Sequence, residues 1–214
     1  MRESIKKLIM ECDFISVDTS ALMEVDTFKK FINESKEALQ KAGRKIFVYR
    51  EVIKELQILY QIAEGEKSTR AEEALGMLYD FYEIFRCEEE PDEVDWNIVR
   101  CTADQRILGA VTWYKPYHSQ LFISNDKKLL KGILQVDKQE AVRGRAVYAA
   151  SLTCDGDLEQ YEESEEYIEE YIKAEDAQKE TYSHGHRKGL LWGSVLGMII
   201  IGGIQCLLRS ENKA

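Results

Sequence analysis

Four short runs of β-branched and aromatic residues recur along the chain, and polar residues follow each of them. Runs of this kind are typical of buried strands that end in a loop. They predict strands at 14–17, 45–49, 121–124 and 146–152. The first and third end in acidic loops, Asp18-Thr19-Ser20 and Asn125-Asp126.

The stretches between these runs repeat apolar residues at intervals of three and four, which predicts helices. We expect helices over 27–42, 51–64, 96–114 and 127–134, and a further helix that begins at Thr69 as its N-cap. Strands separated by helices of ten or more residues indicate βαβ units. The fold class is therefore α/β, with a mostly parallel sheet and helices on both of its faces.

The acidic residues are unevenly distributed. The chain has 214 residues and a formal net charge of −10, and twelve acids against two lysines between 155 and 180 account for all of it. Apolar Leu158, Tyr161 and Ile168 recur there at helical spacing. We expect a solvated helical stalk over 154–186, with a docking surface for a basic partner as the alternative.

Residues 189–208 are uncharged, and as a helix of 20 residues they would measure about 30 Å, the thickness of a bilayer core. Arg187, Lys188 and Arg209 flank the run. We predict a transmembrane helix over 187–209 and a short tail over 210–214: a single-pass C-terminal anchor, with the globular part facing the cytoplasm. A buried hairpin or an oligomer-core helix is the alternative.

Gly185, Gly189, Gly193 and Gly197 follow one another at intervals of four, so they line one face of that helix. Small residues let two backbones approach closely in a membrane. This face is a candidate contact for a homo-dimer, which could instead form through the globular domain. The alternative is that glycine is simply frequent in spans.

Several common signatures are absent. The five cysteines are far apart, with no C-x-x-C pair, which indicates a reducing compartment. No G-x-G-x-x-G, P-loop, G-x-S-x-G or H-E-x-x-H occurs, which excludes the common dinucleotide, nucleotide, hydrolase and zinc-protease sites.

Four acids are placed to meet at one edge of the predicted sheet. Asp18 follows one predicted strand directly and Asp126 stands two residues after another, whereas Glu55 and Asp104 lie on helices that could reach the same edge. Ligands of parallel sheets collect at that edge. Four converging carboxylates repel one another unless a cation neutralises them. Mg²⁺ or Mn²⁺ suits such an all-oxygen set.

The order of these segments resembles the PIN-domain family of nucleases over about residues 13 to 152. The matching segments are FISVDTSALM, VIKEL, TADQRILGAV and LFISNDKKLLK. The resemblance implies a three-layer α/β/α sandwich, with a nuclease domain over 1–153, and a metal-dependent endoribonuclease. It implies that Asp18, Glu55, Asp104 and Asp126 are the catalytic and metal-binding acids, supported by Ser20 and Asn125. Residues 132–145 are longer than this fold needs.

Basic residues near the acids could hold the phosphates of RNA despite the acidic total, among them Lys127, Lys128 and Arg106. The alternative is that they lie on ordinary solvated helix faces. An inhibitory protein partner, as toxin-like PIN proteins have, is a further expectation.

Two rival functions remain open. In one, a non-catalytic PIN-like domain serves as a membrane adaptor and recruits a partner through its acidic helix. In the other, the glycine-rich tail perturbs membranes directly and the globular domain regulates it.

Overall fold

The computed structural model describes residues 3–88, 102–138 and 143–162. Up to Tyr161 they belong to one compact unit. Its centre is a six-stranded sheet with the strand order β3-β2-β1-β4-β5-β6. The strands are β1 (Phe14–Val17), β2 (Ile46–Tyr49), β3 (Phe85–Glu88), β4 (Gln120–Ile123), β5 (Val147–Leu152) and β6 (Leu158–Gln160).

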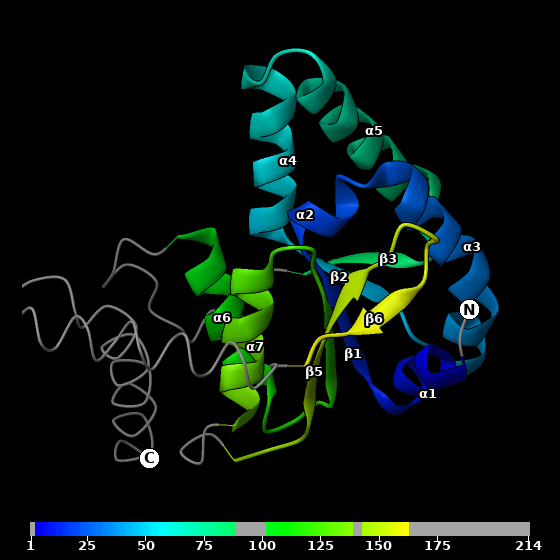
Figure 1. Ribbon diagram of the computed structural model, residues 1–214, viewed down its shortest axis with the longest axis vertical. Helices are drawn as coiled ribbons and strands as arrows, with labels where there is room; N and C mark the ends of the chain where they lie inside the picture. Colours follow the sequence, from blue (N-terminus) through cyan, green and yellow to red (C-terminus); the bar gives the residue numbers. More distant parts are fainter. Residues whose placement is uncertain (1–2, 89–101, 139–142, 163–214) are drawn as a thin grey trace, which may run out of the picture. The chain divides into compact units, whose positions relative to one another are not determined.

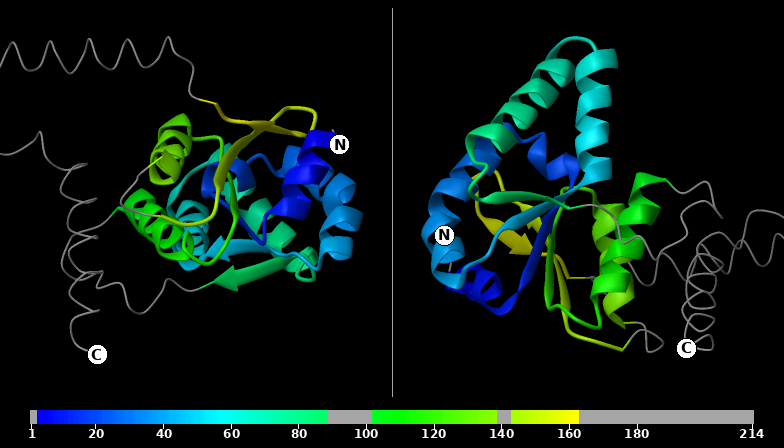
Figure 2. Two further views of the ribbon diagram at one scale, coloured as in Figure 1. Left: turned by 90° about the horizontal axis from the view of Figure 1, so that it is seen from below. Right: turned by 180° about the vertical axis from the view of Figure 1, so that it is seen from behind.

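Every neighbouring pair is parallel except β5 and β6. The helices are α1 (Glu3–Glu11), α2 (Thr19–Leu22), α3 (Val25–Ala42), α4 (Arg50–Ile62), α5 (Glu66–Asp80), α6 (Ala103–Tyr114) and α7 (Lys127–Lys138). On one face of the sheet lie α6 and α7, and on the other lie α1 and α3 (Figures 1 and 2). The predicted mostly parallel α/β sheet with helices on both faces is confirmed.

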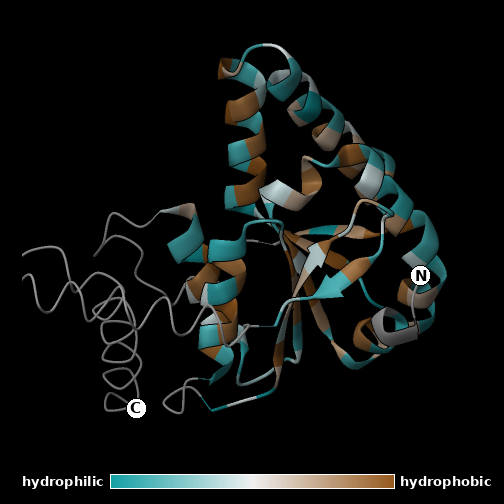
Figure 3. Ribbon diagram, viewed as in Figure 1, coloured by the Kyte–Doolittle hydropathy of each residue, from teal (hydrophilic) through white to brown (hydrophobic). Residues whose placement is uncertain are grey.

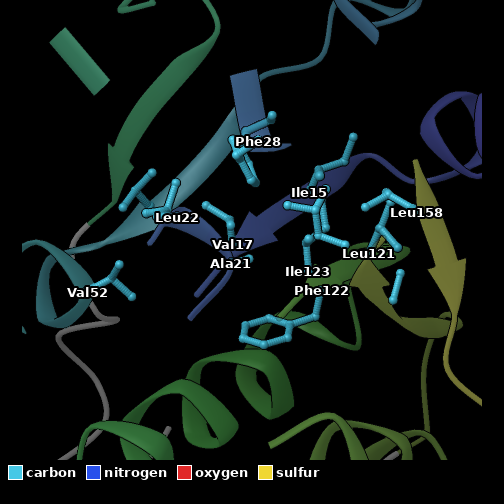
Figure 4. Packing of buried hydrophobic residues seen from close by; sticks show 14 of the residues in the cluster. Ile15, Val17, Ala21, Leu22, Phe28, Val52, Leu121, Phe122, Ile123 and Leu158 are labelled. Atoms are coloured by element: carbon cyan, nitrogen blue, oxygen red, sulfur yellow. The ribbon is translucent and has the colours of Figure 1, made fainter. Parts of the chain in front are cut away.

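Strands β1 and β4 are buried at every position because both faces of the sheet are covered. Leu121 and Ile123 join the cluster of Ile15 and Val17, whereas Phe122 points to the side of α6 and α7 (Figure 4). This alternation follows from the two-residue period of a strand. Apolar residues concentrate along the strands, whereas the helices mix polar and apolar positions (Figure 3). Helix α4 leaves the apolar Ile58 and Ile62 exposed.

The short helix α2, helix α1 and strands β3 and β6 have no counterpart in the prediction. Helix α1 buries Leu8 and Ile9, and it packs beside α3. Strand β3 pairs with β2 at the sheet edge although its sequence, FRCE, has few apolar residues. An edge strand pairs with one neighbour only, so fewer of its side chains need to be apolar. The hydrophobic pattern that would predict such a strand is therefore weak.

Three predicted boundaries are wrong. Thr69 lies inside α5, whose N-cap is Gly65. Residues 158–160 form strand β6 instead of the start of an acidic helix, because Gly156 turns the chain back onto β5 with a φ of 82°. Helix α7 runs on to Lys138, so part of the long stretch 132–145 is helical.

The predicted membrane span and its glycine face, and most of the predicted stalk, lie outside the described residues. Within the described ranges, no helix is long and apolar enough to cross a membrane.

Candidate active site

The candidate site lies at the carboxyl ends of β1 and β4, the two central strands of the parallel sheet. Val17 and Ile123 are register partners at these ends. Asp18 follows β1 directly, is only 6% exposed, and is the N-cap of the short helix α2. Asp126 follows β4 after Ser124 and Asn125. The parallel pairing therefore brings together two acids that are 108 residues apart in the sequence.

One oxygen of Asp18 collects three hydrogen bonds. Its Oδ2 accepts from the backbone N–H of Ser20 at 3.2 Å, from Ser20 Oγ at 2.8 Å and from Ser124 Oγ at 3.0 Å. The two hydroxyls in turn accept from the backbone N–H groups of Asn125, at 2.9 Å, and Asp126, at 3.0 Å. This network fixes the carboxylate of Asp18, while no described residue donates a hydrogen bond to its Oδ1.

Asp126 is likewise held through only one of its two carboxylate oxygens. Its Oδ1 accepts from the backbone N–H groups of Lys128, at 2.8 Å, and Leu129, at 3.2 Å, at the start of α7. Asn125 is bound to β5, since its Oδ1 accepts from the N–H of Leu152 at 2.9 Å. The loop after β4 is thus fixed to its neighbours, and Asp126 presents its second oxygen on an exposed surface.

Glu55 reaches the site from α4, the helix that directly follows β2. The hydroxyl of Thr19, next to Asp18, donates to Glu55 Oε2 at 2.7 Å. Thr19 is buried and Glu55 is exposed. Helix α4 therefore contributes a carboxylate beside the end of β1, again with one oxygen in a protein hydrogen bond.

Asp104 lies in the first turn of α6, and its electrostatics connect it to the other acids. Its pKa is raised by desolvation first, and then by the negative charges of Asp18 and Asp126. Lys128 opposes this shift and lowers the pKa. The negative charges of Asp18 and Asp126 therefore act on Asp104. Hydrogen bonds join Asp18 to Asp126 through Ser124 and hold Glu55 on Thr19, the neighbour of Asp18. That all four acids form one site stays a prediction.

The side chains of the four acids suit a hard divalent cation, because their donor atoms are carboxylate oxygens that carry negative charge. As the side chains stand, however, no three His, Cys, Asp or Glu residues in the described part of the chain form a group that could hold a metal ion. Three of the acids, Glu55, Asp104 and Asp126, are exposed and Asp18 is fixed. The site thus pairs one rigid carboxylate with three on the surface.

The basic residues of the site differ in their contacts. Lys127 and Lys128 are exposed in the first turn of α7, beside Asp126. Arg106 instead forms an ion pair with Glu51 of α4 at 3.1 Å. Phosphate contacts are therefore easier to assign to the two lysines than to Arg106.

Sequence reasoning missed Ser124, Thr19 and Glu51. Ser124 had a usable signal, since it stands at the strand end two residues before Asp126. The contacts of Thr19 and Glu51 depend on the packing of α4, and neither residue type is unusual in its position.

Comparisons with known proteins find similarity among the solved structures. No family model and no curated protein matches the chain. The structure of the PIN domain endonuclease Utp24 matches with 17% identity and a TM-score of 0.42, over 69% of this chain and 90% of that chain. A superposition at this level carries no inference about activity, so the chemistry rests on the geometry of the site.

Proposed function

We propose that this chain is a metal-dependent endoribonuclease of the PIN type, tethered to a membrane by its C-terminal residues. The observation that supports the proposal is the network at the carboxyl edge of the parallel sheet, in which Ser124 joins Asp18 to Asp126 and Thr19, next to Asp18, holds Glu55. Asp104, whose pKa is raised by Asp18 and Asp126, is proposed as the fourth acid. Asp18, Glu55 and Asp126 each keep one oxygen outside the hydrogen bonds described above. The free oxygens would hold Mg²⁺ or Mn²⁺.

In this proposal the protein supplies position and charge. Asp18 is fixed by Ser20 and Ser124 and so orients the centre. Glu55, held through one oxygen by Thr19, would orient the attacking water. Lys127 and Lys128 bind the flanking phosphates. The bound cation supplies the positive charge that an in-line displacement at phosphorus requires.

Cleavage of RNA tests the proposal directly. The full-length chain, kept in mild detergent, is incubated with end-labelled single-stranded RNA and Mn²⁺, next to Asp18→Asn and Asp155→Asn purified in the same way. Asp155 is an exposed acid in the turn between β5 and β6, remote in the sequence from the four acids. We expect Asp18→Asn to abolish cleavage and Asp155→Asn to retain it.

The opposite result favours the adaptor. If the folded wild-type protein cleaves none of several RNA and DNA substrates with Mn²⁺ or Mg²⁺, the nuclease proposal fails. Activity that survives Asp18→Asn would trace the cleavage to another centre or to a contaminant.

The tether rests on the uncharged run 189–208. Flotation of the full-length chain with lipid vesicles tests it. We expect the wild type to float and a variant with Leu196→Arg and Ile200→Arg to remain in the dense fraction, because two charges in a span are costly. Equal flotation of the two proteins would contradict the proposed membrane anchor.

A further inference from the structure

Glu51 is an acid near the candidate site to which the proposed chemistry assigns no role. It lies in the first turn of α4, one helical turn before Glu55. Its Oε1 accepts from Arg106 Nη1 at 3.1 Å, across 55 positions of sequence, and from Lys54 Nζ. One carboxylate therefore links α4 to α6.

This link is better protected than an ordinary surface ion pair. The side chains of Glu51 and Arg106 are 16% and 29% exposed. By comparison, Glu66 and Arg70 of α5 form a pair with side chains 78% and 43% exposed. Partial burial reduces solvent screening, so the interhelical pair constrains geometry more strongly than a solvated one.

The two helices joined by this pair each carry one acid of the site. Glu55 lies one turn beyond Glu51 on the same face of α4. Asp104 lies two residues before Arg106 in α6, so a movement of that helix end away from α4 would carry Asp104 with it. The Glu51–Arg106 contact therefore joins the two helix segments that carry Glu55 and Asp104.

We propose that Glu51 is a positioning residue: by binding Arg106 it holds the start of α6 against α4 and so keeps Asp104 and Glu55 in register at the strand ends. The inference rests on the proposed nuclease function for its kinetic consequence, but its structural part is independent of activity. It also assigns Arg106 to the scaffold of the site instead of to the substrate.

Kinetics of Glu51→Gln, Arg106→Gln and the double variant separate these two roles. We expect each single variant to lower kcat about 10- to 100-fold with KM little changed, since small misplacements of catalytic groups have effects of this size. The double variant should be no worse than either single one. If Arg106 binds phosphate instead, Arg106→Gln raises KM, and Glu51→Gln, which releases two cations, lowers it.

Glu66→Gln is the matched control, because it breaks the exposed Glu66–Arg70 pair within α5. We expect it to retain the wild-type kcat. Circular dichroism and the protection of amides in β1 and β4 show whether each variant is folded.

Amide hydrogen exchange in the metal-free proteins gives a second measurement that needs no cleavage. The N–H of Arg106 donates to Thr102 O at 3.1 Å in the first turn of α6. We expect exchange of the Arg106 and Ile107 amides to accelerate in Glu51→Gln and Arg106→Gln, but not in Asp18→Asn or Glu66→Gln. Unchanged exchange overturns the positioning role, whereas absent cleavage by the wild type overturns only the nuclease.

Discussion

Ser124 donates a hydrogen bond from its Oγ to Oδ2 of Asp18 at 3.0 Å, between residues 106 positions apart. The bond joins the end of β4 to the end of β1. The same Oγ accepts from the N–H of Asp126 at 3.0 Å. A single hydroxyl thus fixes the relative positions of two acids of the candidate site.

Replacing Ser124 by alanine should therefore affect both activity and stability. It removes one of the donors to Asp18 and leaves the N–H of Asp126 without its acceptor. Losing buried hydrogen-bond partners costs about 1–3 kcal/mol, so we expect the free energy of unfolding to fall by that amount. We also expect a drop in cleavage rate of about tenfold or more, from the displaced carboxylates. Urea unfolding and single-turnover cleavage measure the two effects.

Ser16 provides the control for this variant. It is buried in β1, close in sequence to Asp18, and its hydroxyl has no hydrogen-bond partner in the described part of the protein. Ser16→Ala should leave cleavage and stability near wild type. Equal effects of Ser16→Ala and Ser124→Ala would mean that loss of volume, and not the hydrogen bond, is responsible.

The sequence predicts the central strands and the strand-end acids because both have strong local signals. FISV is buried at every position, since β1 is covered on both faces, and Asp18 follows it directly. The contacts of Thr19 with Glu55 and of Glu51 with Arg106 join segments that are 36 and 55 positions apart. Such contacts depend on how α4 packs, which no local pattern encodes.

The missed elements have a different cause. β3 has one strand neighbour, so its sequence is under weaker apolar constraint. β6 is three residues long, and its Leu158 suits a helix pattern as well as a strand. Its conformation follows from the turn at Gly156, where a Cβ would come within 2.6 Å of Lys30 Cβ.

The ionised side chain of Asp104 destabilises the native protein by an amount that depends on pH. Its pKa is raised by desolvation, Asp18 and Asp126, so the native state binds this proton more tightly than the unfolded chain does. This destabilisation is therefore greatest at pH values above the native pKa of Asp104. It decreases as the pH falls below that pKa, and it is lost below the ordinary pKa of an aspartate. We expect Asp104→Asn to be more stable than the wild type at pH 7 and equal to it in acid.

Urea unfolding with a metal chelator, between pH 4 and pH 8, measures this difference. Asp155→Asn serves as the control, and its difference from wild type should not follow the same pH dependence. A stability gain of Asp104→Asn that is constant with pH would contradict the electrostatic origin. Added Mn²⁺ should stabilise the wild type more than Asp104→Asn, because binding to the native state shifts unfolding by mass action.

The described cysteines should differ sharply in reactivity. Burial, followed by the charges of Glu11 and Asp13, raises the pKa of Cys12 to about 12, so its thiol stays protonated at pH 8. Cys87 and Cys154 are exposed. We expect a thiol reagent to label these two within minutes and Cys12 only after unfolding, because the thiolate is the reactive form. Mass spectrometry of the labelled peptides identifies each position, and rapid labelling of Cys12 in the folded protein would contradict its burial.

Lys115 should be the lysine whose removal most destabilises the fold. It is 3% exposed, and its Nζ donates to Val136 O at 2.9 Å and Asp137 O at 2.6 Å, at the end of α7, with Asp137 Oδ1 at 3.5 Å. A cation at a helix C-terminus is favourable, and this one also satisfies buried carbonyls. Lys115→Met keeps most of the side-chain volume but leaves those carbonyls unpaired, so we expect the free energy of unfolding to fall by about 1–3 kcal/mol. Lys41→Met, at an exposed lysine in the last turn of α3, is the matched control and should change stability little. If both substitutions had equal effects in urea unfolding, the bonds from Lys115 to the end of α7 would not be the cause.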